Sequence, residues 1–457
     1  MNLTCHKKTA LLLLVLLLCL AAAGCGKSGD PAAIETAPAA EPLEIGGQSL
    51  SPDTTDLTAV LSAGETAQLD KLPNLHFADL SGSENVEEIS AWAKAHPDIS
   101  VKYTVTLPDG TVLPSDTRSV DFSAASGSDA LAAAPALSLL QNLKILKLGR
   151  ERSSVSWDDI RKLREFLPET SFQYSFDLYG KECDLSSSTI SLFHIPVEDN
   201  AERIDLVMSC MPQLTYVDMD SCGVSNERME ELHLKYPDVK IVWRVWFGEA
   251  YSVRTDVVRI LASKPSVGGM LDNNDAKILY YCHDVRFLDL GHNKALSDYS
   301  FVRGMPKLEV AVLSMCDCSD MSPLADCPEL EYLEIFSTEC SDLTPLKNLT
   351  KLRHLNIANN LGITDLSPLY GLKDLERLWI GSWTVLTNEQ IAEMQRHVPK
   401  CEINTTVYAD PTADGWRYVV IDGESYMAER YYVLRLQFDD YKFSSYSFSR
   451  NDPLCPQ

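Results

Sequence analysis

Two short clusters of carboxylates and thiols are the residues best suited by type to bind a metal ion. The run from Asp218 to Gly223, Asp-Met-Asp-Ser-Cys-Gly, matches the start of a calcium-binding loop, but Met229 stands where such a loop needs glutamate. Four cysteines lie close together further on: Cys316, Cys318, Cys327 and Cys340. Such spacing occurs in zinc sites, where the ligands converge on a tetrahedral centre. Whether either cluster converges depends on the elements that carry it.

Catalytic signatures are missing from the sequence. It has no G-x-S-x-G, no H-E-x-x-H, no phosphate-binding loop and no glycine-rich dinucleotide motif, and its nine histidines are scattered singly. The formal net charge of −25 disfavours nucleic acid and anionic lipid as electrostatic partners, because both attract Lys and Arg. We therefore expect a non-enzymatic protein with no cofactor, no metal and no nucleic-acid partner.

A repeat between Val285 and Pro399 supplies the frame for these residues. Copies of the pattern L-x-x-L-x-L begin at Val285, Leu308, Leu330, Leu352 and Leu375. Eight residues after these starts come Asn293, Cys316, Thr338, Asn360 and Trp383, of which the first four are types that fill the asparagine position of leucine-rich repeats. Three copies continue with D-x-[ST]-P-L, whose proline opens a short helical turn. The pattern predicts an α/β leucine-rich-repeat solenoid with a parallel sheet on its concave side.

The repeat frame also bears on the cysteines. Cys316 takes an asparagine position, Cys318 and Cys340 take equivalent turn positions one repeat apart, and Cys327 lies in the convex segment. Side chains in register do not converge on one ion, so the frame disfavours zinc. A disulfide between Cys318 and Cys340 remains open, because neighbouring strands lie roughly 4.8 Å apart, within bridging range. Cys222 likewise takes an asparagine position, which disfavours calcium in the acidic run.

Longer units of the same kind precede these repeats. The strand pattern opens at Leu75, Leu143 and Leu214, at steps of about 70 residues. Each unit continues with an amphipathic helix (86–96, 157–166, 226–236), an alternating strand (99–106, 172–178, 241–247) and a glycine turn (109–110, 180, 248), which together predict a projecting hairpin. Residues 45–57 resemble the second half of such a unit, so we expect an N-terminal cap there.

The face of the sheet opposite the leucine core is the predicted binding surface, because alternate strand residues point away from the core. The candidate ligand-binding residues are Phe287, Asp289, Tyr332, Glu334, Phe336 and Trp379. Exposed aromatic side chains are typical of interfaces with proteins or glycans. The alternative is that neighbouring columns or the C-terminal cap cover these aromatic residues.

The N-terminus has the pattern of an export signal. Lys7 and Lys8 precede the apolar run from Ala10 to Leu20, and Ala22-Ala23-Gly24 leads into Cys25. This arrangement resembles the lipobox of bacterial lipoproteins, which implies that Cys25 is diacylated and becomes the first residue of the mature chain. We expect a signal peptide at 1–24, a flexible tether at 25–42 and a location on the extracytoplasmic face of the membrane.

From Leu43 onward the chain resembles leucine-rich-repeat lipoproteins of gut Firmicutes, whose repeats are related to those of the internalins. The stretches that carry the resemblance include 236–240, 251–256, 288–293 and 375–381, and a tail with Gly415-Trp416-Arg417 followed by 430–438, where Leu434 replaces the family's Met. The resemblance implies architecture more firmly than function.

The predicted organisation of the mature chain has three parts. Residues 43–284 hold the cap and the long units, 285–400 the short repeats, and 401–457 the C-terminal cap and tail. The expected function is binding or adhesion at the cell envelope, with a protein or glycan ligand on the concave face and the membrane reached through the lipid. A structural spacer without a ligand and an envelope hydrolase are the alternatives.

Overall fold

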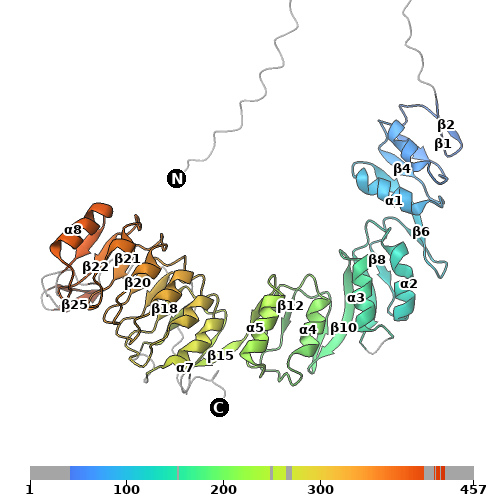
Figure 1. Ribbon diagram of the computed structural model, residues 1–457. Helices are drawn as coiled ribbons and strands as arrows, with labels where there is room; N and C mark the ends of the chain where they lie inside the picture. The colour runs from blue at the N-terminus through green and yellow to red at the C-terminus, as the bar shows by residue number, and fades with distance from the viewer. Residues whose placement is uncertain are drawn as a thin grey trace, which may run out of the picture. The chain divides into compact units, whose positions relative to one another are not determined.

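The computed structural model describes residues 42–151, 154–247, 251–263, 270–405, 416, 418–421 and 424–427. The chain divides into two compact units, one reaching to Thr104 and the other starting at Val105 (Figure 1). Cys25 and the predicted signal peptide lie outside the described residues. Among the helices that are described, none has the length and apolar character needed to cross a membrane.

The first unit opens with a hairpin and continues as a small parallel sheet. Strands β1 (Leu43–Ile45) and β2 (Gln48–Leu50) pair antiparallel across Gly46-Gly47. The parallel sheet contains β3 (Asp56–Thr58), β4 (Phe77–Asp79) and β5 (Ser100–Lys102), and its helical segments are η1 (Thr66–Lys71) and α1 (Val86–Ala95). Gly46 has a φ of +57°, and a Cβ there would lie 2.8 Å from that of Ala59, so this turn requires glycine.

The second unit begins with long units that contain four described helices: α2 (Gly127–Leu137), α3 (Trp157–Phe166), α4 (Glu202–Ser209) and α5 (Asn226–Lys235). Of these, α3 and α5 start at the predicted residues Trp157 and Asn226. Ser126, Ser156 and Ser225 each accept a hydrogen bond from the backbone amide three residues on, which satisfies an otherwise unpaired donor of the first turn. These caps define the helix starts.

The strands of the long units form two parallel groups and two described hairpins. One group contains β8 (Ser119–Asp121), β9 (Ile145–Arg150) and β10 (Ser171–Leu178), and the other β12 (Thr189–Ser191), β13 (Tyr216–Asp218) and β14 (Lys240–Val242). Strand β10 turns back into β11 (Lys181–Asp184), and β15 (Arg244–Phe247) pairs antiparallel with β16 (Tyr251–Arg254). Strands β6 (Thr104–Thr106) and β7 (Val112–Pro114) flank the turn at Asp109-Gly110. The predicted hairpins are confirmed.

The short repeats build a parallel sheet of seven strands. These are β17 (Arg259–Leu261), β18 (Phe287–Asp289), β19 (Val310–Val312), β20 (Tyr332–Glu334), β21 (His354–Asn356), β22 (Arg377–Trp379) and β23 (Glu402–Asn404). Leu288, Ala311, Leu333, Leu355 and Leu378 are aligned across neighbouring strands and fully buried. The predicted register and the leucine-rich-repeat fold are therefore confirmed, with one further strand at each end.

Short helices carry the chain from one strand of this sheet to the next. They are α7 (Asn273–Ala276), η2 (Lys277–Tyr281), η3 (Ser300–Gly304), η4 (Ser322–Asp326), η5 (Thr344–Leu346), η6 (Ser367–Leu369) and α8 (Asn388–His397). Pro323, Pro345 and Pro368 each stand in the first turn of their helix, as predicted, where a missing amide hydrogen costs nothing. A last hairpin of β24 (Tyr418–Ile421) and β25 (Glu424–Met427) follows.

The parallel strands form four separate sheets and not one continuous sheet. One holds β3 to β5, one β8 to β10 with β11 at its edge, one β12 to β14, and one β17 to β23. Each break falls where the chain leaves the strand row to form a hairpin before it resumes the row. The sequence pattern predicts the hairpins but not this interruption of the sheet.

The side chains at the asparagine position of successive repeats form a column. They make hydrogen bonds to the backbone groups that are left open where each strand ends. The Asn360 amide nitrogen donates to the carbonyls of Ile335 (2.7 Å) and Ile357 (3.0 Å), and its oxygen accepts from the amides of Thr338 (2.9 Å) and Cys340 (3.2 Å). Cys316 makes a weaker version of this contact, because its thiol donates to the Leu290 carbonyl at 3.3 Å. Trp383 departs from the column and is 68% exposed.

We expect Asn360→Ala to destabilise the protein by roughly 2–4 kcal/mol, because it leaves several buried backbone groups without partners at about 1–3 kcal/mol each. Cys316→Ala is the matched control in the same column and removes one weak hydrogen bond, so its effect is expected to be smaller. Thermal unfolding followed by circular dichroism measures both. Equal losses in the two variants would contradict the role given to the asparagine amide.

Candidate binding face

The predicted site residues lie together on the face of the seven-stranded sheet opposite the leucine core, here called the outer face. The third repeat position aligns Phe287, Val310, Tyr332, His354 and Arg377 on neighbouring strands, and the fifth aligns Asp289, Val312, Glu334, Asn356 and Trp379. Phe336 packs against the aromatic cluster on this face. The structure thus brings all six candidates together, as the repeat register predicts.

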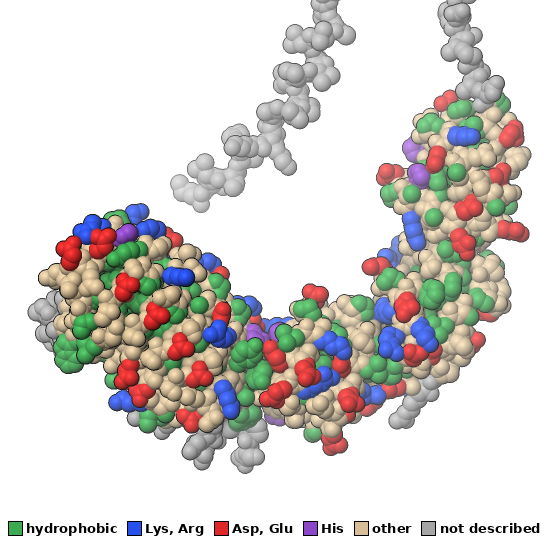
Figure 2. Space-filling view, viewed as in Figure 1, with side chains coloured by type: hydrophobic (Ala, Val, Ile, Leu, Met, Phe, Trp, Pro, Cys, Tyr) green, Lys and Arg blue, Asp and Glu red, His purple; other side chains and the backbone are tan. Residues whose placement is uncertain are grey.

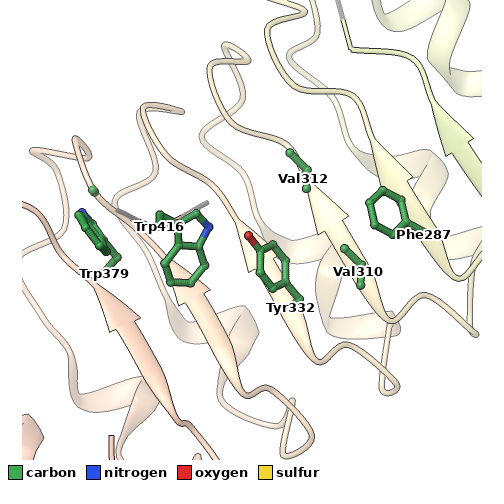
Figure 3. Close-up of a cluster of buried hydrophobic side chains, with 7 residues drawn as sticks. Phe287, Val310, Val312, Tyr332, Trp379 and Trp416 are labelled. Atoms are coloured by element: carbon green, nitrogen blue, oxygen red, sulfur yellow. The ribbon is translucent and has the colours of Figure 1, made fainter. Parts of the chain in front are cut away.

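The exposure expected for the aromatic candidates is wrong. Phe287, Tyr332 and Trp379 are at most 4% exposed, and Glu334 is 2% exposed. They form one buried cluster with Val310, Val312 and Trp416 (Figure 3). The alternative that the sequence left open, coverage from the C-terminal part of the chain, is what the structure shows for Trp416. The reason is Trp416, which lies 82 positions after Glu334 and belongs to no repeat.

Four side chains of the outer face surround the Trp416 indole and are here called the Trp416 box: Tyr332, Glu334, Arg377 and Trp379. The rings of Tyr332 and Trp379 have centroids 5.4 and 6.3 Å from that of Trp416, and the Trp379 ring meets it edge-on. The indole Nε1 donates to Glu334 Oε1 at 2.6 Å. The Arg377 guanidinium lies 4.7 Å from the centre of the Trp416 ring and donates to the Trp416 backbone carbonyl at 3.0 Å. The box therefore contacts both a side chain and a main-chain group.

The two charged members of the box are buried yet hydrogen-bonded. Glu334 accepts from the Tyr332 hydroxyl and from the Trp416 indole, and the Ser314 hydroxyl lies 3.5 Å away. Arg377 is 5% exposed, and its guanidinium carbon lies 5.3 Å from the centre of the Trp379 ring and 4.7 Å from that of Trp416. Burial of an unpaired charge costs several kcal/mol, so these contacts are needed for either group to stay inside. Arg377 and Trp416 are the box residues that the sequence-based candidate list missed, although the G-W-R motif drew attention to Trp416.

Neither cluster of possible metal ligands forms a metal site. Asp220 is fully buried, and both of its carboxylate oxygens accept from Arg244, at 2.8 and 2.9 Å. Cys318 and Cys340 are both free thiols. Over the part of the chain that the structure describes, no three His, Cys, Asp or Glu side chains are grouped so as to hold a metal ion.

A pair of stacked histidines joins the last long unit to the short repeats. The rings of His233 and His283 lie 5.0 Å apart at 18°. One ring nitrogen of His283 lies 2.9 Å from Glu230 and the other 2.7 Å from the Gly304 carbonyl. Both partners are acceptors, so the two contacts favour the form of His283 in which both ring nitrogens carry protons. Burial opposes this charge, but the bonds to Glu230 and Gly304 outweigh it and raise the pKa of His283. Burial and the neighbouring charge of His283 lower the pKa of His233.

Comparisons with known proteins give distant structural similarity only. No family profile and no curated protein matches the sequence. Internalin F of Listeria monocytogenes is similar at 16% identity over 80% of this chain and 86% of that one, with a TM-score of 0.29. A leucine-rich-repeat protein of Leptospira interrogans is similar at 15% identity over 74% and 91%, with a TM-score of 0.31. Likeness at this level carries no information about ligands, so function has to come from the residues of this chain.

The histidine pair predicts a pH-dependent stability. A group whose pKa is raised on folding contributes stability that is present below its unfolded pKa, about 6.5, and is lost as pH rises through the folded value. We therefore expect the stability advantage of the native protein over His283→Gln to be larger at pH 6 than at pH 8.5. The pKa of His233 is lowered on folding, so its contribution to stability has the opposite pH dependence and changes below pH 6.5. Glu230, Asp284 and Lys307 also face the two histidines. Thermal unfolding across this range is the measurement, and an advantage that grows with pH would refute the assignment.

Proposed function

We propose that this chain is a non-enzymatic binding protein of the bacterial cell envelope, and that the outer face of its seven-stranded sheet recognises a protein segment. The Trp416 box carries the proposal. It encloses an indole between aromatic rings, offers a carboxylate to the indole N–H and offers a guanidinium to a backbone carbonyl. Buried aromatic and arginine anchors of this kind dominate the binding energy of protein interfaces.

The box favours a peptide over a glycan. The bond from Arg377 to the Trp416 carbonyl, at 3.0 Å, is made to a main-chain group that recurs along every peptide. The indole bond to Glu334 then selects a tryptophan side chain at that position. The preferred ligand is therefore an extended segment with a tryptophan.

In the structure the occupant of the box belongs to the same chain, so an external segment must replace Trp416. A segment tethered in cis acts at an effective concentration of about millimolar. The native protein should therefore bind an external segment weakly until Trp416 is released. If Trp416 is instead a permanent cap, the chain is better described as a structural spacer, and these two roles give different binding results.

The test uses a fluorescent peptide with the sequence of residues 413–421. We expect Trp416→Ala to bind it at least tenfold more tightly than the native protein does, because the competing occupant is gone. Adding Glu334→Gln should weaken that binding by about tenfold, since it removes a charge-assisted hydrogen bond. Trp383→Ala is the control, because this exposed tryptophan lies outside the box. Fluorescence anisotropy gives the affinities, with a melting curve for each variant.

Two outcomes decide between receptor and cap. Binding to Trp416→Ala that depends on Glu334 supports the receptor. Absence of binding to a folded Trp416→Ala protein, or binding that ignores Glu334, overturns it and leaves the spacer.

The envelope location rests on Cys25, which the resemblance to lipoproteins makes the acylated residue. The acidic chain has little electrostatic affinity for anionic lipid, whereas two acyl chains anchor stably where one is marginal. We expect Cys25→Ser to leave the membrane fraction or to remain unprocessed at a higher mass. Cys19→Ser, in the apolar run, is the matched control and should behave as the native protein does. Fractionation and mass spectrometry of the intact protein report both, and an unchanged Cys25→Ser protein would refute acylation.

A further inference from the structure

A cavity of about 480 Å³ lies beside the histidine pair, far along the chain from the Trp416 box. Its lining includes His233, Lys240, Tyr281, His283, Asp284 and Lys307. The volume falls in the usual range for sites that hold small molecules, roughly 300–1,000 Å³. All of these residues belong to the second unit, and they come from α5, from the start of β14, from the end of η2 with the loop after it, and from the loop after η3. The cavity is therefore built where the last long unit meets the first short repeats.

Two lysines converge in this cavity on one carboxylate. Lys240 Nζ lies 2.8 Å from one oxygen of Asp284, and Lys307 Nζ lies 2.5 Å from the other. Each ammonium group has three donors and uses one on Asp284, so further donors of both lysines remain for a ligand. Both lysine side chains are at least half exposed. Together with Asp284 the two lysines carry one net positive charge, in a chain whose formal net charge is −25 and whose acidic side chains are spread over the viewed surface (Figure 2).

The lining also contains the carboxylates of Asp238 and Asp256, so the positive excess is local to Lys240, Lys307 and Asp284. His283 is hydrogen-bonded to Glu230, and a carboxylate oxygen of Asp256 lies 3.1 Å from Arg254 Nε. Asp238 is exposed and lies two residues before Lys240. A ligand carboxylate would thus meet two ammonium groups that are already held in place. Such charge-assisted bonds are about twice as strong as neutral ones.

Aromatic rings form another part of the lining. Tyr281 and His233 contribute half-buried rings, and the buried indole of Trp243 lies 6.1 Å from Tyr281 between ring centres. Flat apolar walls beside a few polar groups are typical of small-ligand sites. We propose that this cavity binds a carboxylated sugar, with the acid group on Lys240 and Lys307 and the sugar ring against Tyr281 and His233. This site is independent of the peptide site on the outer face.

Isothermal titration of the full mature chain with glucuronate tests the proposal. Glucose supplies the ring without the acid group, and acetate supplies the acid group without the ring. We expect glucuronate to bind at least tenfold more tightly than either. The double variant Lys240→Ala/Lys307→Ala should lose at least tenfold in affinity for glucuronate, and it should fold because both side chains are largely exposed. Lys294→Ala is the matched control at an exposed lysine elsewhere.

The remaining comparisons make the result decisive. Tyr281→Ala should weaken glucuronate binding while acetate binding stays unchanged, which separates the ring contact from the charge contact. Trp416→Ala should bind glucuronate as the native protein does, so failure of the outer-face proposal would not affect this one. The proposal is overturned if glucuronate does not bind, if glucose or acetate binds equally well, or if the double lysine variant retains full affinity.

Discussion

Backbone groups left open at the end of each strand are the constraint on which the repeat array depends. A parallel strand that stops and turns leaves carbonyls and amides inside the protein, and burial of each such group without a partner costs about 1–3 kcal/mol. The amide of Asn360 and that of Asn293 satisfy these groups on their own and the preceding repeat. Neighbouring repeats are therefore coupled by hydrogen bonds as well as by packing, as expected of an array whose stability is a sum over neighbours.

The same turn imposes a strained backbone conformation. The residue before the asparagine position has a positive φ in successive repeats, at His292, Met315, Ser337 and Asn359. Left-handed geometry costs roughly 1–2 kcal/mol for residues other than glycine, and asparagine tolerates it best. This cost is offset because the turn places the next side chain where it can form hydrogen bonds with the open backbone groups. Asparagine and histidine are enriched in this conformation, but Met315 and Ser337 adopt it as well, so the side-chain type at this position is not determined by backbone strain.

Features set by local period were predictable from the sequence, whereas features set by distant contacts were not. The leucine spacing predicted the register of Leu333 and Leu355, and the amphipathic pattern predicted α3 to the residue. The candidate face followed from strand alternation. Its burial did not, because Trp416 approaches from outside the repeats. The cavity beside His233 could not be predicted from the sequence either. Lys240, Asp284 and Lys307 come from three separate segments that are not related by the repeat spacing.

The cysteines of the repeat core have a consequence for the chemistry that the protein can withstand. A thiol is oxidised chiefly as its thiolate. Burial raises the pKa of Cys316 to about 11 and that of Cys318 to about 12, so both remain protonated at neutral pH and shielded from oxidants. Cys316 fills the asparagine position of its repeat with a small side chain that donates one weak hydrogen bond. Asn293, Thr338 and Asn360 hold this position in other repeats. Thiols held in this way are inert, so Cys316 and Cys318 can stand in oxidising surroundings without being converted to sulfenic acids.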